Sequence, residues 1–129
     1  MPVGEDVPRW DITIPAGASF HDFVQWVQPD GVTPVTMAGY TAQMDFRRRY
    51  NDPVPLVTLT NGNGLTIHED TGTVDIDLTH QQSSILGMDR ECVVLTALEV
   101  TSPEGFRTRL FDGMWTVTPE ATRDIPEGG

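Results

Sequence analysis

The clearest pattern in this chain is the run Gly39-Tyr40-Thr41-Ala42-Gln43-Met44-Asp45-Phe46-Arg47-Arg48. After a glycine suited to a turn, Ala42, Met44 and Phe46 fall on one face of an extended segment. The positions between them are polar. An alternation with a period of two residues is typical of a β-strand with one buried face and one wet face. The run contains no catalytic motif, so it predicts a scaffold element rather than an active site.

Similar short segments follow one another along the chain, separated by turn signals. Besides the opening run, the predicted strands are residues 10–14, 19–28, 54–60, 65–68, 71–78, 91–101 and 106–118. The turn at residues 61–64, Asn-Gly-Asn-Gly, predicts a tight hairpin that pairs residues 65–68 beside residues 54–60. A change of apolar phase near Asp112 and Gly113 predicts a β-bulge at the glycine.

Two segments differ from this series of strands. Residues 79–86 are predicted to form a helix of at most two turns, with Thr79 as N-cap, Gln82 completing a capping box and Gly87 ending it. Residues 91–101 carry apolar side chains on both faces. Such a strand is expected at the centre of a sheet rather than at its edge.

These patterns predict an all-β protein, an antiparallel immunoglobulin-like β-sandwich of about eight to nine strands with one short helical connection. The predicted organisation is an N-terminal arm at residues 1–8, the β-sandwich domain at residues 9–118 and a C-terminal arm at residues 119–129. The predicted core consists of Trp10, Ile14, Trp26, Met44, Phe46, Leu59, Ile67, Ile76, Leu98, Leu110 and Trp115.

Composition and charge narrow the classes of function. The chain has 129 residues, of which 38% are hydrophobic, and no apolar run approaches the ~20 residues of a membrane helix. With 19 acidic residues, eight arginines and a net charge of −11, the surface should repel nucleic acid and anionic membranes. A lone cysteine, Cys92, cannot form an intramolecular disulfide. We therefore expect synthesis in a reducing cytoplasm and no binding of nucleic acid or membrane.

The densest group of potential metal ligands is His68-Glu69-Asp70, with Asp75 and Asp77 further along the chain. Calcium requires six to eight oxygen ligands from a looped backbone, and the spacing here matches no calcium loop. Asp75 and Asp77 fall on the wet face of one predicted strand. The group is therefore interpreted as a solvated strand face beside an acidic turn, and no metal is expected.

No nucleophile has a catalytic setting in the sequence. Cys92 begins an apolar strand and is interpreted as an inert buried thiol. Ser83 and Ser84 lack the glycine-flanked elbow of a hydrolase. The three histidines are far apart, and none has a zinc-like spacing to Cys92. We assign no catalytic residue and expect no cofactor and no enzymatic activity.

The run Arg47-Arg48-Arg49 is the only cationic cluster in the sequence. Contact with nucleic acid or phosphate is one interpretation, and a solvating cluster at the end of a strand is another. On a strongly acidic chain we favour a third, that these arginines contact an acidic neighbouring subunit, such as another copy of the chain.

Several segments, in this order, resemble those of small structural proteins of tailed bacteriophages and prophages. The segments are residues 11–18 (Asp-Ile-Thr-Ile-Pro-Ala-Gly-Ala), 39–44, 56–60, 98–105, 108–110 and 116–123. Together they extend over nearly everything from Trp10 to Arg123, whereas residues 85–92 depart from the usual pattern. The resemblance implies a β-sandwich virion component similar to the N-terminal domains of phage baseplate and fibre-bearing proteins, with no known enzymatic activity.

The sequence thus predicts a non-enzymatic virion structural protein of a tailed bacteriophage, at the tail, baseplate or fibre attachment. Its expected partners are other virion proteins and copies of itself, and its expected location is the virion, after synthesis in the host bacterial cytoplasm. A capsid decoration (cement) protein is the first alternative. A carbohydrate-binding module is the second, because the aromatic rings of Trp10, Trp26, Trp115 and Tyr40 could form a platform.

Overall fold

A computed structural model describes residues 2–3 and 8–119, so the predicted arms at 1–8 and 119–129 lie largely outside the described residues. The described part contains nine strands and one helix. In chain order they are β1 (Pro2–Val3), β2 (Thr13–Pro15), β3 (Phe20–Trp26), β4 (Thr41–Arg47), β5 (Val57–Asn61), β6 (Gly64–His68), β7 (Thr73–Leu78), α1 (His80–Leu86), β8 (Cys92–Thr101) and β9 (Arg107–Thr118). No helix in this part is long and apolar enough to cross a membrane.

Strand β4 confirms the alternation from which the fold was predicted. Ala42, Met44 and Phe46 are buried, whereas the polar residues between them are partly or fully exposed. The strand pairs antiparallel with β5 on one side and with β8 on the other. Each buried side chain here removes apolar surface from water, which contributes about 25 cal/mol per Å².

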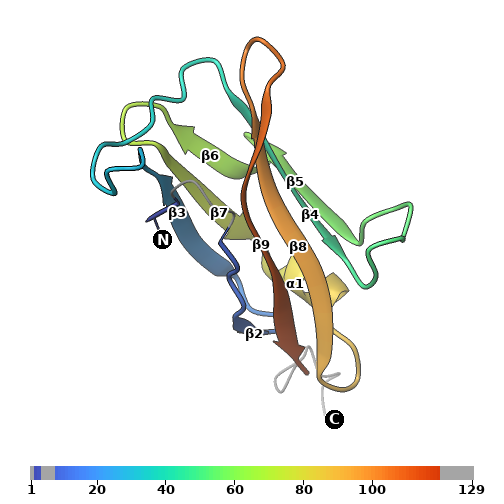
Figure 1. Cartoon of the computed structure of the whole chain (residues 1–129). Helices are drawn as coiled ribbons and strands as arrows, with labels where there is room; N and C mark the ends of the chain where they lie inside the picture. The colour runs from blue at the N-terminus through green and yellow to red at the C-terminus, as the bar shows by residue number, and fades with distance from the viewer. Residues whose placement is uncertain (1, 4–7, 120–129) are drawn as a thin grey trace.

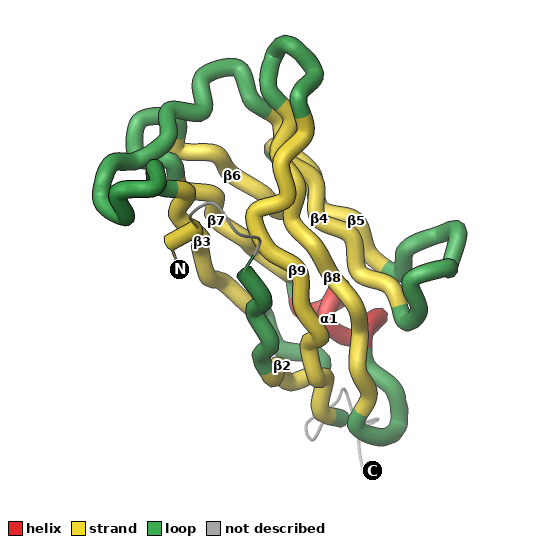
Figure 2. Tube along the Cα trace, viewed as in Figure 1, coloured by secondary structure: helices red, strands yellow, loops and turns green. Residues whose placement is uncertain are grey.

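The strands form two layers that face each other (Figures 1 and 2). The hydrogen-bonded order is β1-β3-β7-β6-β5-β4-β8-β9-β2, and the two layers are joined between β6 and β5. There, only Thr60 with Gly64 and Asn61 with Leu65 are paired. The predicted hairpin between β5 and β6 is therefore wrong, because the glycine-rich turn carries the chain from one layer to the other and β6 pairs antiparallel with β7 instead.

The strand order is that of an immunoglobulin-like sandwich. One layer has the order β3-β7-β6 and the other the order β5-β4-β8-β9, which corresponds to B-E-D facing C′-C-F-G in that fold. Helix α1 lies at the connection between β7 and β8. The prediction of an all-β immunoglobulin-like sandwich with one short helical connection is confirmed, and β8 is central, as expected, between β4 and β9.

The core lies between the two layers. Of the predicted core, eight residues are buried: Ile14, Met44, Phe46, Leu59, Ile76, Leu98, Leu110 and Trp115. The other three, Trp10, Trp26 and Ile67, are partly buried and pack against the same cluster. Trp115 is at the centre of the aromatic packing, with its ring centroid 5.4 Å from that of Phe46 and 5.3 Å from that of Phe20.

The β-bulge in β9 lies at Leu110 rather than at Gly113. Leu98 pairs with Phe111 and Glu99 with Arg109, which leaves Leu110 as the extra residue, whereas Gly113 stays in register with Thr96. The bulge allows both Leu110 and Phe111 to be buried, and this produces the change of apolar phase.

Gly113 is required for a different reason, the close approach of the N-terminal segment. A Cβ at this position would lie 2.0 Å from the carbonyl oxygen of Trp10. The absence of a side chain lets residues 8–15 run along β9, where β2 pairs parallel with Thr116, Val117 and Thr118.

Helix α1 has the predicted capping. The hydroxyl of Thr79 accepts from the backbone N–H of Gln82, and the Gln82 side chain accepts from the backbone N–H of Thr79. At the other end the N–H of Gly87 donates to the carbonyls of Ser83 and Ser84. These bonds satisfy backbone groups that a short helix cannot pair internally.

Candidate functional site

The outer face of β4, β8 and β9 is the surface on which polar and apolar groups are most closely organised. Its strand register places side chains in rows across the three strands: Arg47, Leu95 and Met114; Asp45, Ala97 and Asp112; Gln43, Glu99 and Arg109; and Thr41, Thr101 and Arg107. Tyr50 of the β4–β5 turn also lies on this face. The outward-facing apolar side chains of β8 are partly exposed to solvent, and Val93 is 45% exposed. The predicted central position of β8 in its sheet is nevertheless confirmed.

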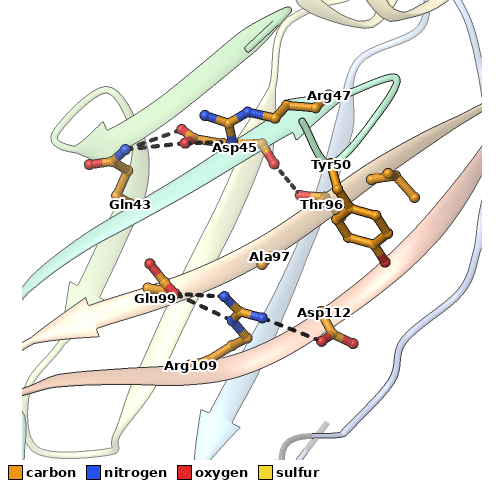
Figure 3. A pocket seen from close by; sticks show the side chains of 10 residues that line it. Gln43, Asp45, Arg47, Tyr50, Thr96, Ala97, Glu99, Arg109 and Asp112 are labelled. Carbon is orange, nitrogen blue, oxygen red and sulfur yellow. Dashed lines mark hydrogen bonds and ion pairs between the residues drawn. The ribbon is translucent and has the colours of Figure 1, made fainter. Parts of the chain in front are cut away.

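A hollow of about 220 Å³ opens on this face over Ala97 (Figure 3). The methyl group of Ala97 is short, whereas Leu95 and Glu99 on the same strand are long. Asp45 on β4 and Asp112 on β9 stand on its two sides, and the ring of Tyr50 stands at one end of it. The lining is Gln43, Asp45, Arg47, Tyr50, Leu95, Thr96, Ala97, Glu99, Arg109 and Asp112.

The charged groups around the hollow hold one another in place. Arg47 contacts the Asp45 carboxylate at 3.0 Å, and the Gln43 amide donates to the same carboxylate at 3.2 Å. Arg109 donates to Glu99 at 3.1 Å and lies 3.7 Å from a carboxylate oxygen of Asp112. The hollow therefore presents planar hydrogen-bonding groups in a preset arrangement.

The structure separates the three arginines that were predicted to contact a subunit. Arg47 ends β4 and points onto the outer face, where its Nε also donates to the carbonyl of Asp52 at 3.1 Å. Arg48 reaches the other way and donates to the Leu86 carbonyl at 3.2 Å. Arg49 is exposed in the following turn. The three side chains do not share one patch, and their predicted role as a contact remains a prediction.

Exposed apolar side chains lie on the β4–β5 turn and on and just after α1, two segments that we together call the turn–helix end. The Arg48 bond to Leu86 ties the turn to the helix, and both lie at the same side of the sandwich (Figure 2). The apolar residues are Val54, 75% exposed, Leu56, 36%, Ile85, 54%, and Met88, 44%.

Of the potential metal ligands considered in the sequence, Asp75 and Asp77 each pair with a histidine on the opposite sheet, and one of these histidines, His21, was not in that group. His68 Nε2 lies 2.8 Å from Asp75, and His21 Nδ1 lies 2.6 Å from Asp77. The hydrogen bond to Asp77, followed by its charge, raises the pKa of His21 above its usual value. Among the described residues, no three His, Cys, Asp or Glu side chains are grouped closely enough to hold a metal ion.

The other candidate residues have structural contacts. Cys92 is partly buried and packs against the core, and its Sγ lies 3.4 Å from the Leu86 carbonyl. The buried Ser83 hydroxyl donates to the Ala18 carbonyl at 2.8 Å and accepts from the N–H of Gly17 at 3.0 Å. These bonds join α1 to the β2–β3 turn.

The aromatic platform predicted for the carbohydrate-binding alternative is not formed. Trp115 is fully buried, and Trp10 packs edge-on against it with ring centroids 5.6 Å apart. Trp26 packs edge-on against Tyr40 at 6.0 Å. The exposed aromatic ring beside polar groups is instead that of Tyr50, which the sequence analysis did not single out.

The strand order defines this chain as an all-β protein with an immunoglobulin-like β-sandwich fold. No protein-family model matches the chain, and no curated protein does. Among solved structures, the chain is similar to the N-terminal domain of phage TP901-1 ORF48, with 10% identity and a TM-score of 0.47 over 92% of this chain and 94% of that one. It is also similar to murine CRIg, with 13% identity and a TM-score of 0.40 over 85% and 92% of the two chains.

Proposed function

We propose that this chain is a non-enzymatic structural protein of a tailed-bacteriophage virion, a tail, baseplate or fibre-attachment component that binds its neighbours through the turn–helix end. The binding role is supported by the exposure of apolar side chains on these two segments, above all Val54 and Ile85, which are 75% and 54% exposed. Burying such side chains in a contact is favourable in proportion to the apolar area removed from water. The phage assignment is supported by the ordered sequence resemblance from Trp10 to Arg123.

Two residues of the arginine run, Arg48 and Arg49, fit this proposal. Arg48 fixes the turn to α1 through the Leu86 carbonyl, so it would shape the contact surface. Arg49 is exposed at the rim of the same turn and would meet an acidic neighbour, since rim charges act mainly on partner choice and association rate. The proposed partners are other virion proteins and copies of this chain.

Immunogold labelling of purified virions tests the proposed location. The expected result is label on the tail, at the baseplate or where the fibres attach. Label over the head would favour a capsid decoration protein instead, and absence of the protein from purified virions would contradict a structural role in the virion.

Incorporation of variants into virions tests the proposed surface. A phage lacking the gene is complemented with Val54→Asp plus Ile85→Asp, and the protein in purified virions is quantified by immunoblot. The expected result is a loss of incorporation, because two carboxylates would be buried in the contact. Val32→Asp is the matched control, since Val32 is 79% exposed but lies in the β3–β4 connection. Normal incorporation of the double variant would contradict this surface.

A further inference from the structure

The hollow over Ala97 is a candidate small-molecule site on the outer face of β4, β8 and β9. In register, Asp45, Ala97 and Asp112 occupy one row, so the shortest side chain has a carboxylate on each side. A second hollow of about 550 Å³ shares Gln43, Asp45 and Glu99 with the first. The two hollows together offer room for a ligand longer than the first one alone can hold.

The polar groups here can both donate and accept hydrogen bonds. A carboxylate accepts at about four lone-pair positions and a guanidinium carries five N–H donors, so the contacts within the hollow leave capacity for a ligand. Asp112, for example, meets Arg109 only at 3.7 Å. Because these side chains already hold one another, a ligand would bind groups that lose little freedom on binding.

Tyr50 adds an apolar surface to this polar site. The residue is 78% exposed, and its ring stands at one end of the hollow (Figure 3). A tyrosine ring can pack against a flat C–H face while its hydroxyl remains hydrogen-bonded, as happens where one side of a contact is apolar and the other wet. An exposed ring beside carboxylate, amide and guanidinium groups suits a ligand with hydroxyls at its edge and C–H groups on its face.

The charges around the hollow favour an uncharged ligand over an anion or a cation. The lining has three carboxylates, Asp45, Glu99 and Asp112, against two guanidiniums, Arg47 and Arg109, and the chain carries a net charge of −11. An anion would be repelled by this field. A cation would have to displace arginines that already contact these carboxylates. We propose that the hollow binds a neutral saccharide, whose hydroxyls meet the polar rim and whose ring face lies against Tyr50.

Binding of defined sugars tests the proposal. The probes are an array of neutral oligosaccharides built from glucose, galactose, mannose and N-acetylhexosamines. Sialylated oligosaccharides form the anionic comparison set. Binding to the full chain is measured by calorimetry and by changes in NMR chemical shift. We expect a neutral oligosaccharide to bind and sialylated ones to bind less well. Shift changes should centre on Ala97, Glu99 and Asp112.

Two variants localise the binding. Tyr50→Ala should weaken it about tenfold through the lost ring contact. Ala97→Leu should abolish it by filling the hollow, and since Ala97 faces outward the fold should persist, as thermal melting will show. Phe106→Ala is the matched control, because Phe106 is 74% exposed in the β8–β9 turn, away from the hollow lining.

Two results would overturn the proposal. One is no binding of any neutral oligosaccharide at millimolar concentration, and the other is binding that Tyr50→Ala and Ala97→Leu leave unchanged. If Ala97→Leu is unstable, Tyr50→Ala alone decides, since the exposed ring contributes little to the fold. Incorporation into virions is measured separately on Val54 and Ile85, so failure here leaves the proposed function standing.

Discussion

The indole N–H of Trp115 donates a 3.0 Å hydrogen bond to the carbonyl oxygen of Trp10, a residue 105 positions earlier in the chain. This bond joins the N-terminal segment to β9 at the centre of the core. The backbone bonds from Trp10 to Asp112, at 2.9 Å, and from Thr116 to Ile12, at 2.8 Å, hold the segment on either side. The segment thus closes one edge of the sandwich.

Replacing the indole tests this connection. Trp115→Phe keeps an aromatic ring but leaves the partly buried Trp10 carbonyl without its donor. We expect a loss of about 1–3 kcal/mol in the free energy of unfolding, the cost of an unsatisfied polar group, measured by urea denaturation. Phe106→Leu, at an exposed position, should change the free energy of unfolding by less than about 0.5 kcal/mol. Equal stability of Trp115→Phe and the wild type would contradict the role of this bond.

Gly113→Ala tests the approach of the N-terminal segment to β9. Because the new Cβ would lie 2.0 Å from the Trp10 carbonyl oxygen, the segment must move away, at a cost of about 1–3 kcal/mol. The N–H of Thr116, which donates to Ile12, should exchange its hydrogen faster in NMR. Met114→Ala, beside it but facing outward, is the control and should leave that exchange rate unchanged. Unaltered exchange in Gly113→Ala would mean that the segment is not held there.

The capping box of α1 predicts a further stability effect. Thr79→Ala removes the oxygen that accepts from the Gln82 N–H at 3.1 Å. The expected loss in the free energy of unfolding is about 1 kcal/mol, typical of a lost N-cap. Thr79→Ser keeps the hydroxyl and should retain most of the stability in the same denaturation experiment. Similar losses for both substitutions would show that the methyl group, rather than the cap, matters.

The pair His21 and Asp77 should make stability depend on pH. The hydrogen bond between them, together with the carboxylate charge, raises the pKa of His21 in the folded chain above its usual 6.5. The folded state therefore binds the proton more tightly than the unfolded chain does. The resulting stabilisation is fully present below pH 6.5 and is lost as the pH rises through the raised pKa.

Asp77→Asn should lower the pKa of His21 in an NMR titration. The Asp77→Asn variant should lose more stability relative to the wild type at pH 5 than at pH 8. These two pH values lie about one and a half units below and above the usual histidine pKa. In a His21→Gln background, the same substitution should show no such difference between the two pH values. A wild-type His21 pKa at or below its usual value would contradict the pairing.

Much of the scaffold could be predicted from neighbouring residues alone. The alternation in β4 identified its buried face, and Thr79 with Gln82 identified the helix start, because strand periodicity and capping operate over two to four residues. The predicted position of the β-bulge, Gly113, was wrong, because a glycine within a strand is only a local sign of a bulge. The extra residue is Leu110, which is left unpaired because Leu98 pairs with Phe111 and Glu99 pairs with Arg109. The turn at residues 61–64 was recognised, but its local chemistry does not distinguish a hairpin from a change of layer.

The candidate sites depended on contacts between distant parts of the chain. Arg47, Arg48 and Arg49 are adjacent in sequence, yet Arg47 contacts Asp45 on the outer face whereas Arg48 reaches the Leu86 carbonyl, because β4 ends at Arg47 and the chain bends after it. The hollow exists only because β4 and β9 bring Asp45 and Asp112 to the two sides of Ala97. Periodicity, turns and capping are local and could be recognised along the chain. Strand register and the order of layers arise from pairing between residues as far as 103 positions apart, such as Thr13 and Thr116, so only the folded structure established which side chains form a surface together.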